Sequence, residues 1–271
     1  MVCHAYISRH ARKYVNRSVD IKHKKEKNYM KILVLGANGV TGFNVVTQLL
    51  RQGIDVKALT RNTEKFDSIK NSEHIEVLKA SILEIDNQKL KQYLYEVDAV
   101  ISCLGHNISF KGIFGKPYTL VVDALIKIVN NINEISKNKT IKIVLMNTTA
   151  CINKLQNEKF KQNENFVMKI MRFLLPPQRD NELALGYLID TVGISNKHIE
   201  WIAVRPDTLV NEIEVSEYAV YPSPLRSPIF DAGKTSRINV ADFMVSLLKD
   251  KELWEKWKYK TPVIYNLVSK K

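Results

Sequence analysis

The stretch that decides the fold is residues 32–42, Ile-Leu-Val-Leu-Gly-Ala-Asn-Gly-Val-Thr-Gly. A short apolar run over Ile32–Leu35 is typical of a buried parallel strand. Three glycines follow in a G-x-x-G-x-x-G pattern, and helical spacing over Val40–Gln52 ends at Gly53. A strand, a glycine-rich turn and a helix in this order predict a pyrophosphate site at the helix N-terminus. The residues expected to line it are Gly36, Asn38, Gly39, Val40, Thr41 and Gly42.

Strands and helices alternate along the rest of the chain. Apolar runs predict strands, and amphipathic spacing predicts helices between them. The fold class that we expect is therefore α/β, a Rossmann-type doubly wound parallel sheet with a small C-terminal substrate-side cap. Residues 30–271 form one domain in this prediction, and the cap elements begin at about 207. The strands are expected at Val56–Leu59, Ile75–Leu78, Ala99–Ser102, Ile141–Met146, Ile202–Val204 and Val263–Val268, and the helices at Tyr118–Ile135, Glu182–Val192 and Val240–Lys249.

The composition is that of an ordinary folded protein. The chain has 271 residues, of which 45% are hydrophobic and 25% are charged, which excludes a disordered or collagen-like class. No apolar run approaches the roughly 18 residues of a membrane helix, so we expect no membrane partner. Three cysteines, Cys3, Cys103 and Cys151, favour a reducing compartment, and we expect a cytoplasmic location.

The positive charge is concentrated at the start of the chain. The net charge is +13, and residues 1–29 hold eight Lys/Arg against two acidic residues. We expect this basic leader to be an unstructured extension ahead of Met30. Organelle targeting, or an arm that binds nucleic acid or anionic lipid, remain open alternatives. No nucleic-acid recognition motif accompanies the charge, so no specific nucleic-acid partner is expected.

The end of the second predicted strand indicates the nucleotide. It reads Leu59-Thr60-Arg61-Asn62, with arginine where an NAD-binding chain usually carries Asp or Glu for the ribose 2′-OH. A guanidinium suits a 2′-phosphate, so NADP(H) is preferred over NAD(H). The alternative is that Arg61 is a solvated surface residue beside Lys57 and Lys65.

Four motifs together resemble a known family. They are Gly36–Gly42 (GANGVTG), Ala58–Arg61 (ALTR), Val97–Gly105 (VDAVISCLG) and Trp201–Pro206 (WIAVRP). The chain from about Met30 to Val268 resembles the NAD(P)H-binding branch of the atypical short-chain dehydrogenase/reductases, which includes flavin reductase/biliverdin reductase-like and NmrA-like proteins.

The resemblance implies where further residues meet the cofactor. It places Ser81 and Ile82 near the adenine, although the family often has Asp where Ser81 stands. It also implies that the segment Cys103, Leu104 and Gly105 passes the ribose and nicotinamide. Asn147 and Thr148 then line the nicotinamide side.

The catalytic positions depart from the commonest pattern of the superfamily. None of the eleven tyrosines is followed by Lys four residues later, and Tyr187 has Thr191 at that spacing. The candidate catalytic residues are Arg179 and His106. Arg179 could lie over the cofactor and be oriented by Asp180 or Glu182. The alternative is an N-terminal helix cap, for which Asp180 and Asn181 are good residues.

A loop over residues 105–115 carries the other candidate. His106, Phe110 and Phe114 could lie at the cofactor mouth, with His106 as a proton donor or as an exposed histidine without a role. Asp207 could shape the substrate pocket.

The function expected from these residues is an NADPH-dependent reductase that transfers hydride to a flavin-like, quinone-like or other planar acceptor. The alternative is a non-catalytic NADP(H)-binding redox sensor. No residue cluster has metal-ligand spacing. A small-molecule substrate and a monomer or homodimer are expected.

Overall fold

The computed structural model describes residues 6–7, 30–106, 115–135 and 139–267. Within these residues, nine strands form one sheet in the order β1-β9-β11-β7-β6-β5-β2-β3-β4. The neighbours from β11 to β4 are parallel, whereas β9 runs antiparallel to β11 and β1 antiparallel to β9. The strands are β1 (Tyr6–Ile7), β2 (Lys31–Leu35), β3 (Asp55–Thr60), β4 (Ile75–Lys79), β5 (Ala99–Ser102), β6 (Ile141–Met146), β7 (Ile199–Pro206), β9 (Tyr218–Tyr221) and β11 (Val263–Asn266).

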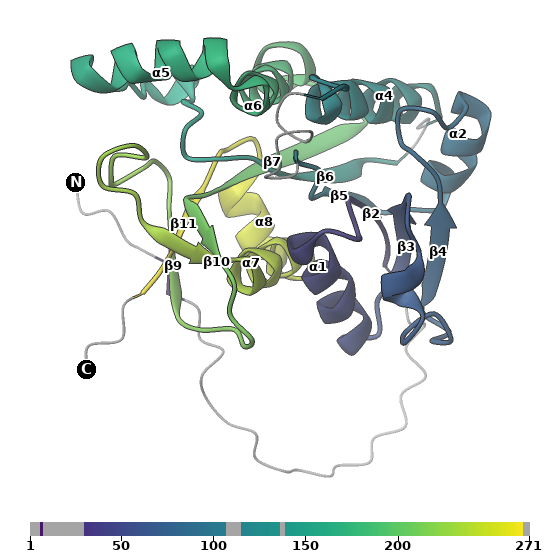
Figure 1. Cartoon of the computed structure of the whole chain (residues 1–271). Coiled ribbons are helices and arrows are strands. Elements are labelled where there is room, and N and C mark those ends of the chain that lie inside the picture. Colours follow the sequence, from purple (N-terminus) through teal and green to yellow (C-terminus); the bar gives the residue numbers. More distant parts are fainter. Residues whose placement is uncertain (1–5, 8–29, 107–114, 136–138, 268–271) are drawn as a thin grey trace.

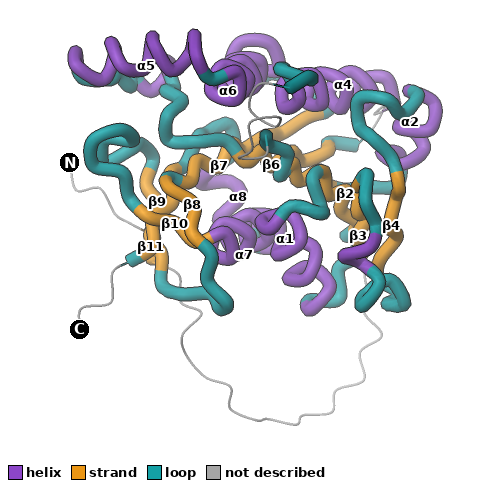
Figure 2. The backbone as a smooth tube through the Cα atoms, in the orientation of Figure 1, coloured by secondary structure: helices purple, strands orange, loops and turns teal. Residues whose placement is uncertain are grey.

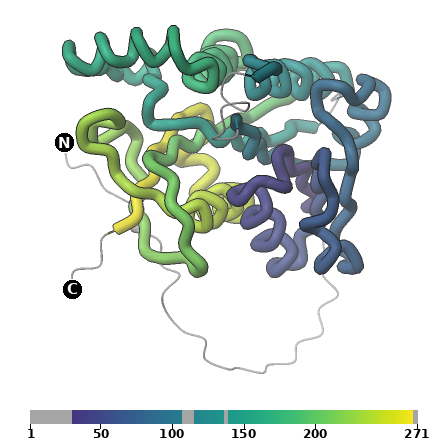
Figure 3. Tube along the Cα trace, in the orientation of Figure 1, coloured from purple at the N-terminus to yellow at the C-terminus, as the bar shows by residue number. Residues whose placement is uncertain are grey.

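The strand order reverses beside β2. The chain runs from β2 outward to β3 and β4, and then returns to the other side of β2 with β5, β6 and β7. The colours in Figure 3 follow this path, from purple and blue on one half of the sheet to green and yellow on the other. The reversal creates a switch point between β2 and β5, where open parallel sheets bind ligands. The predicted doubly wound α/β fold is confirmed.

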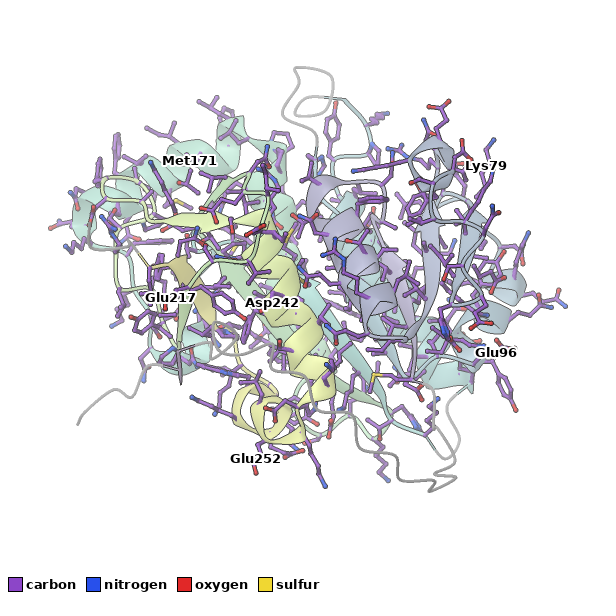
Figure 4. All side chains as sticks on the ribbon, turned by 90° about the horizontal axis from the view of Figure 1, so that it is seen from below. Lys79, Glu96, Met171, Glu217, Asp242 and Glu252 are labelled. Atoms are coloured by element: carbon purple, nitrogen blue, oxygen red, sulfur yellow. The ribbon has the colours of Figure 1, made fainter. Side chains whose placement is uncertain are left out.

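Helices cover both faces of the sheet (Figures 1 and 2). One layer contains α1, α7 and α8, and Figure 4 shows α1 and α7 packed side by side. The opposite layer contains α2, α4, α5 and α6, and α6 continues into a π-helical turn over Tyr187–Val192. The helices are α1 (Val40–Arg51), α2 (Asn87–Tyr95), α4 (Leu120–Ile135), α5 (Gln162–Leu174), α6 (Pro176–Gly186), α7 (Arg237–Lys249) and α8 (Lys251–Trp257).

Two apolar cores lie on the two sides of the sheet. In β2, Ile32 and Val34 belong to the core under α1 and α7, while Leu33 and Leu35 belong to the core under α4. All four side chains are buried. A strand covered on both faces needs apolar residues at every position, which explains the continuous run in the sequence.

The predicted strands are confirmed, and the last one ends at Asn266; Val268 lies outside the described residues. The predicted helices over 40–52, 118–135 and 240–249 are found with slightly shifted ends. The helix expected over Glu182–Val192 begins earlier, at Pro176, because proline is well tolerated in the first turn of a helix. Its second half is π-helical rather than α-helical.

The chain after residue 207 contributes largely to the main fold. It supplies β9, α7, α8 and β11 to the sheet and one helical layer. A short parallel pair, β8 (Thr208–Val210) with β10 (Lys234–Ser236), lies beside them. The sequence analysis did not predict β9, and it gave no bounds for α2, α5 or α8.

Of the basic leader, the structure describes only Tyr6–Ile7. This strand pairs with β9, so that Tyr6 lies opposite Val220 and Ile7 opposite Ala219. The charged residues of the leader lie outside the described residues, and the expectation of an unstructured extension stays a prediction.

Candidate functional site

The glycine turn joins β2 to α1 at the switch point. Gly36 has a left-handed backbone with φ +69°, and its carbonyl accepts a hydrogen bond from Gly39 N at 3.0 Å. Gly39 is the N-cap of α1 and brings no capping side chain, and the first turn of the helix contains no acidic residue. The N–H groups of this turn therefore lack a side-chain acceptor and suit an anionic ligand.

Two of the glycines allow close backbone contacts. A Cβ on Gly42 would lie 2.2 Å from the carbonyl oxygen of Gly36, so only glycine lets α1 pack this tightly against the turn. A Cβ on Gly36 would lie 2.7 Å from the carbonyl oxygen of Cys103 and 3.0 Å from Leu104 N. The turn and the segment after β5 are therefore in direct backbone contact, as expected for two parts of one site.

The segment after β5 continues along β2 before leaving the sheet. Cys103 N donates to Leu35 O at 3.0 Å, and the Cys103 side chain is buried. Burial raises the pKa of this thiol to about 12, so it is a packed thiol rather than a reactive thiolate. Gly105 is exposed and has open space around it.

Asn147, after β6, is used to hold a helix. Its Nδ2 donates to Asn181 O in α6 at 2.9 Å, and its Oδ1 accepts from Thr148 N at 2.9 Å. The side chain is buried, so its amide positions α6 against the end of β6. Thr148 is half-buried, and its hydroxyl accepts from Ala150 N at 3.3 Å.

Two cations follow β3, Arg61 directly after the strand and Lys65 in the short 3-10 helix Glu64–Phe66. Arg61 is exposed and forms no ion pair among the described residues. Lys65 donates from Nζ to Asn38 O in the glycine turn at 3.3 Å and lies 4.4 Å from the centre of the Phe43 ring. Burial lowers the pKa of Lys65. Lys65 is thus a second cation at the turn, which the sequence analysis treated only as a neighbour of Arg61.

The residues after β4 divide between surface and core. Ser81 is half-buried, and its carbonyl accepts from Glu84 N and Ile85 N. Ile82 is buried in the core under α4, so only its backbone is available to a ligand.

His106 is held by a buried carboxylate. Its Nε2 lies 2.8 Å from Asp180 Oδ2, and the two side chains are 5% and 0% exposed. The carboxylate of Asp180 also accepts from Val121 N at 2.8 Å and Val122 N at 2.9 Å. Asp180, on α6, therefore caps α4 and fixes the imidazole. Phe110 and Phe114, expected beside His106, lie outside the described residues.

The expected pairing of Arg179 with its neighbouring acids is wrong. Asp180 is fully engaged by α4 and His106. Glu182 instead accepts two hydrogen bonds from Nε of Arg172, at 2.6 and 2.8 Å. Neither acid caps α6, which begins with proline at N1. The guanidinium of Arg179 is exposed and forms no ion pair among the described residues.

A buried ion pair organises the edge of the sheet after β7. Arg205 is fully buried and forms two hydrogen bonds to the Glu158 carboxylate, at 2.6 and 2.7 Å. It also donates to Thr261 O and Cys151 O, both at 2.8 Å. Burial would raise the pKa of Glu158, but the Arg205 guanidinium holds it below its ordinary value. The arginine of the WIAVRP motif is therefore structural, and its partner Glu158 was missed because nothing local marks it.

Asp207 follows this pair and shapes the next loop. Its two carboxylate oxygens accept from Thr208 N and Gly233 N, each at 2.9 Å. Burial raises its pKa, and these hydrogen bonds oppose the rise.

Direct contacts connect most of the predicted site. The glycine turn touches Cys103 and Leu104, the same segment continues to His106, and His106 binds Asp180 on α6. Asn147 then binds the residue after Asp180. The side chains of Arg61 and Arg179 form no hydrogen bond or ion pair with this group among the described residues. Within the same residues, no group of three or more His, Cys, Asp or Glu is arranged to hold a metal.

These features define a class of protein. A doubly wound sheet with a glycine turn at its switch point, open to an uncapped helix N-terminus, is the architecture of a dinucleotide-binding protein. The chain belongs to the NAD(P)H-binding family, whose profile matches residues 36–251. A search of curated proteins finds no match.

Solved structures share this fold at low sequence identity. A short-chain dehydrogenase/reductase from Veillonella parvula in complex with NADP has a TM-score of 0.63 at 17% identity, over 88% of this chain and 95% of its own. An anaerobillin reductase from Escherichia coli O157:H7 has a TM-score of 0.62 at 13% identity, over 89% and 100%. An oxidoreductase from Lactococcus lactis has a TM-score of 0.62 at 14% identity, over 88% and 91%.

The glycine contacts give a first prediction. Gly42→Ala should displace α1 from the turn, because its Cβ would lie 2.2 Å from the Gly36 carbonyl oxygen. We expect a lower melting temperature and at least about a tenfold loss of NAD(P)H affinity, since the N–H groups of the turn lose their alignment. Gly186→Ala, in α6, is the matched control, because the nearest contact of its added Cβ is Asp190 Oδ2 at 3.9 Å. Equal behaviour of the two variants in thermal melting and NADPH titration would contradict this account.

The buried ion pair gives a second prediction. Arg205→Leu leaves the Glu158 carboxylate buried without its partner, which should destabilise the fold by about 3–5 kcal/mol. Urea unfolding measures this loss. Arg226→Leu removes an exposed pair with Asp231 and should leave the unfolding midpoint unchanged. A small effect of Arg205→Leu would mean that Glu158 reaches water when the guanidinium is removed.

Proposed function

We propose that this protein is an NADPH-dependent reductase that transfers hydride to a flavin-like, quinone-like or other planar acceptor. The observation that carries the proposal is the His106–Asp180 pair, which follows directly on the segment in contact with the glycine turn. A bound nicotinamide supplies the hydride. The protein's own groups hold the dinucleotide and deliver a proton.

His106 is the proton donor in this proposal. Reduction of a conjugated ring adds a hydride and a proton, and the proton is replaced from solvent after each cycle. Asp180 is a positioning residue, because its carboxylate fixes the imidazole while the N-terminus of α4 fixes the carboxylate. This arrangement gives the histidine one orientation, although it belongs to a segment that has left the sheet.

The tyrosine in the usual catalytic region supports a planar acceptor rather than an alcohol. Burial raises the pKa of Tyr187, and no lysine follows it at the spacing that would oppose the rise. A carbonyl/alcohol reductase needs the opposite shift in its tyrosine. Planar acceptors require less of the protein, because the reacting rings carry the electronic change and the site has only to stack them.

NADP(H) is the dinucleotide that the charges favour. The residues after β3 are Arg61 and Asn62, without an acid for a ribose 2′-OH. Lys65 adds a second positive charge beside the glycine turn, where its Nζ donates to Asn38 O, and it forms no ion pair among the described residues. A 2′-phosphate would supply an anionic partner for this lysine.

The proton-donor role predicts the effect of one substitution. His106→Asn should lower kcat for NADPH oxidation, with FMN or biliverdin as acceptor, about a hundredfold or more, while NADPH affinity stays the same. His198→Asn is the control, because His198 precedes β7 at the opposite edge of the sheet. Stopped-flow absorbance of the nicotinamide band measures both quantities.

The same assay separates the proposal from the sensor alternative. Tight NADPH binding without turnover across flavin, quinone and tetrapyrrole acceptors would favour a redox sensor. Turnover that is unaffected by His106→Asn would be consistent with a reductase but would exclude His106 as its proton donor.

The proposed preference for NADP(H) predicts how two substitutions change nucleotide affinity. Arg61→Ala and Lys65→Ala should each weaken NADPH binding about tenfold or more, because each removes a charge-assisted contact to the 2′-phosphate, and should leave NADH binding unchanged. Arg51→Ala, at the far end of α1, is the matched control. Isothermal titration of each variant with NADPH and with NADH measures these affinities, and equal weakening for both nucleotides would contradict a 2′-phosphate role.

A further inference from the structure

Helix α5 exposes an apolar face to solvent. Phe166, Ile170, Phe173 and Leu174 are 67%, 43%, 88% and 53% exposed. Ile170, Phe173 and Leu174 follow Phe166 by four, seven and eight residues, and this spacing places all four side chains on one side of the helix. The opposite side is anchored by Met168, which is fully buried, and by Glu164. The apolar face of this amphipathic helix is therefore turned away from the protein.

The position of α5 leaves this face accessible. Figure 1 shows α5 at the outer end of its helical layer, extending beyond α6 and away from the sheet. Met171, labelled in Figure 4, lies in the last turn of α5, close to the start of α6. Four large exposed apolar side chains on three turns of one helix form the kind of patch that marks an interaction site.

Within residues 154–183, the exposed charged side chains that form no ion pair among the described residues are positive. Over residues 154–183, each acid is used internally: Glu158 by Arg205, Glu182 by Arg172, Asp180 by α4 and His106, and Glu164 by the N-terminus of α5. The cations left exposed, without an ion pair among the described residues, are Lys154, Lys159, Lys161, Lys169 and Arg179. The apolar face therefore lies on a stretch of chain with an excess of exposed positive charge, and Lys169 belongs to α5 itself. The exposed acid Asp231, whose charge acts on Lys161, is paired with Arg226.

We propose that α5 docks this protein peripherally on an anionic lipid membrane. Phe166, Ile170 and Phe173 would enter the boundary between head groups and acyl chains, and the lysines would contact the head groups. Charge favours lipid over a second copy of the chain, because a twofold contact would bring identical basic surfaces together. No helix among the described residues is long and apolar enough to cross a membrane. The docking is at the surface, and it revises the expectation that no membrane partner exists.

Vesicle sedimentation of the full chain tests this proposal. We expect binding to phosphatidylcholine vesicles that contain roughly one-third phosphatidylserine, little binding to pure phosphatidylcholine, and weakening at high salt. The double variant Phe166→Ser/Phe173→Ser should lower the partition coefficient at least about tenfold. Lys169→Glu should lower it about fivefold or more.

Two exposed residues at the other end of the same helical layer provide matched controls. Tyr95→Ser and Lys89→Glu, both in α2, should leave binding unchanged. A reporter separates insertion from adsorption: Phe173→Trp should show a blue-shifted emission on anionic vesicles. Its signal is distinguishable because Trp201, Trp254 and Trp257 are buried.

Three results would overturn the proposal. One is absence of binding to anionic vesicles. Another is binding that survives Phe166→Ser/Phe173→Ser, which would assign it to the basic leader. The third is a dimer in light scattering that dissociates in the same double variant, which would assign the face to a second copy of the chain.

Discussion

The backbone contact between the glycine turn and the segment after β5 is the constraint on which the site depends. Gly36 lies so close to Cys103 that a Cβ on Gly36 would overlap the Cys103 carbonyl oxygen. A Cβ on Gly42 would likewise overlap the carbonyl oxygen of Gly36. Because β2 and β5 are neighbours at the point where strand order reverses, both segments leave the sheet at one edge. The lack of side chains at two positions thus brings the N-terminus of α1 to the place where the chain beyond β5 must pass.

Asp180 extends this arrangement to the second helical layer. One carboxylate satisfies the first N–H groups of α4 and also holds His106, so α6, α4 and the segment after β5 share a single buried anion. Arg205 acts similarly across the sheet, because its guanidinium joins the ends of β7 and the chain around Cys151, Glu158 and Thr261. Such groups are costly to bury unless every partner is present, and here the partners come from elements far apart in the sequence.

This separation explains what the sequence could and could not predict. The strands were predictable because burial on both faces requires apolar residues at successive positions, as in Ile32–Leu35. The glycine turn was predictable because its spacing has a steric cause. In contrast, Asp180 lies 59 residues from Val121 and 74 from His106, and Arg205 lies 47 from Glu158. Local sequence patterns do not indicate pairs that are so far apart in the chain. The sequence analysis therefore expected Asp180 to orient Arg179, its neighbour in sequence. Helix α5 escaped notice for another reason: its apolar side chains do not face the core.

The burial and pairing of acidic side chains also determine where the positive net charge is exposed on the protein surface. A total of +13 over the chain suggests a diffuse basic surface. Around α5, however, the positive surface arises because four carboxylates are consumed inside by capping and ion pairs, while the lysines stay outside. The fold thereby separates charges that are mixed in the sequence. The excess of exposed lysines near this apolar helix face, without ion pairs among the described residues, is then a consequence of how the buried acids are paired. The face forms on the same run of chain, residues 154–183, that positions His106.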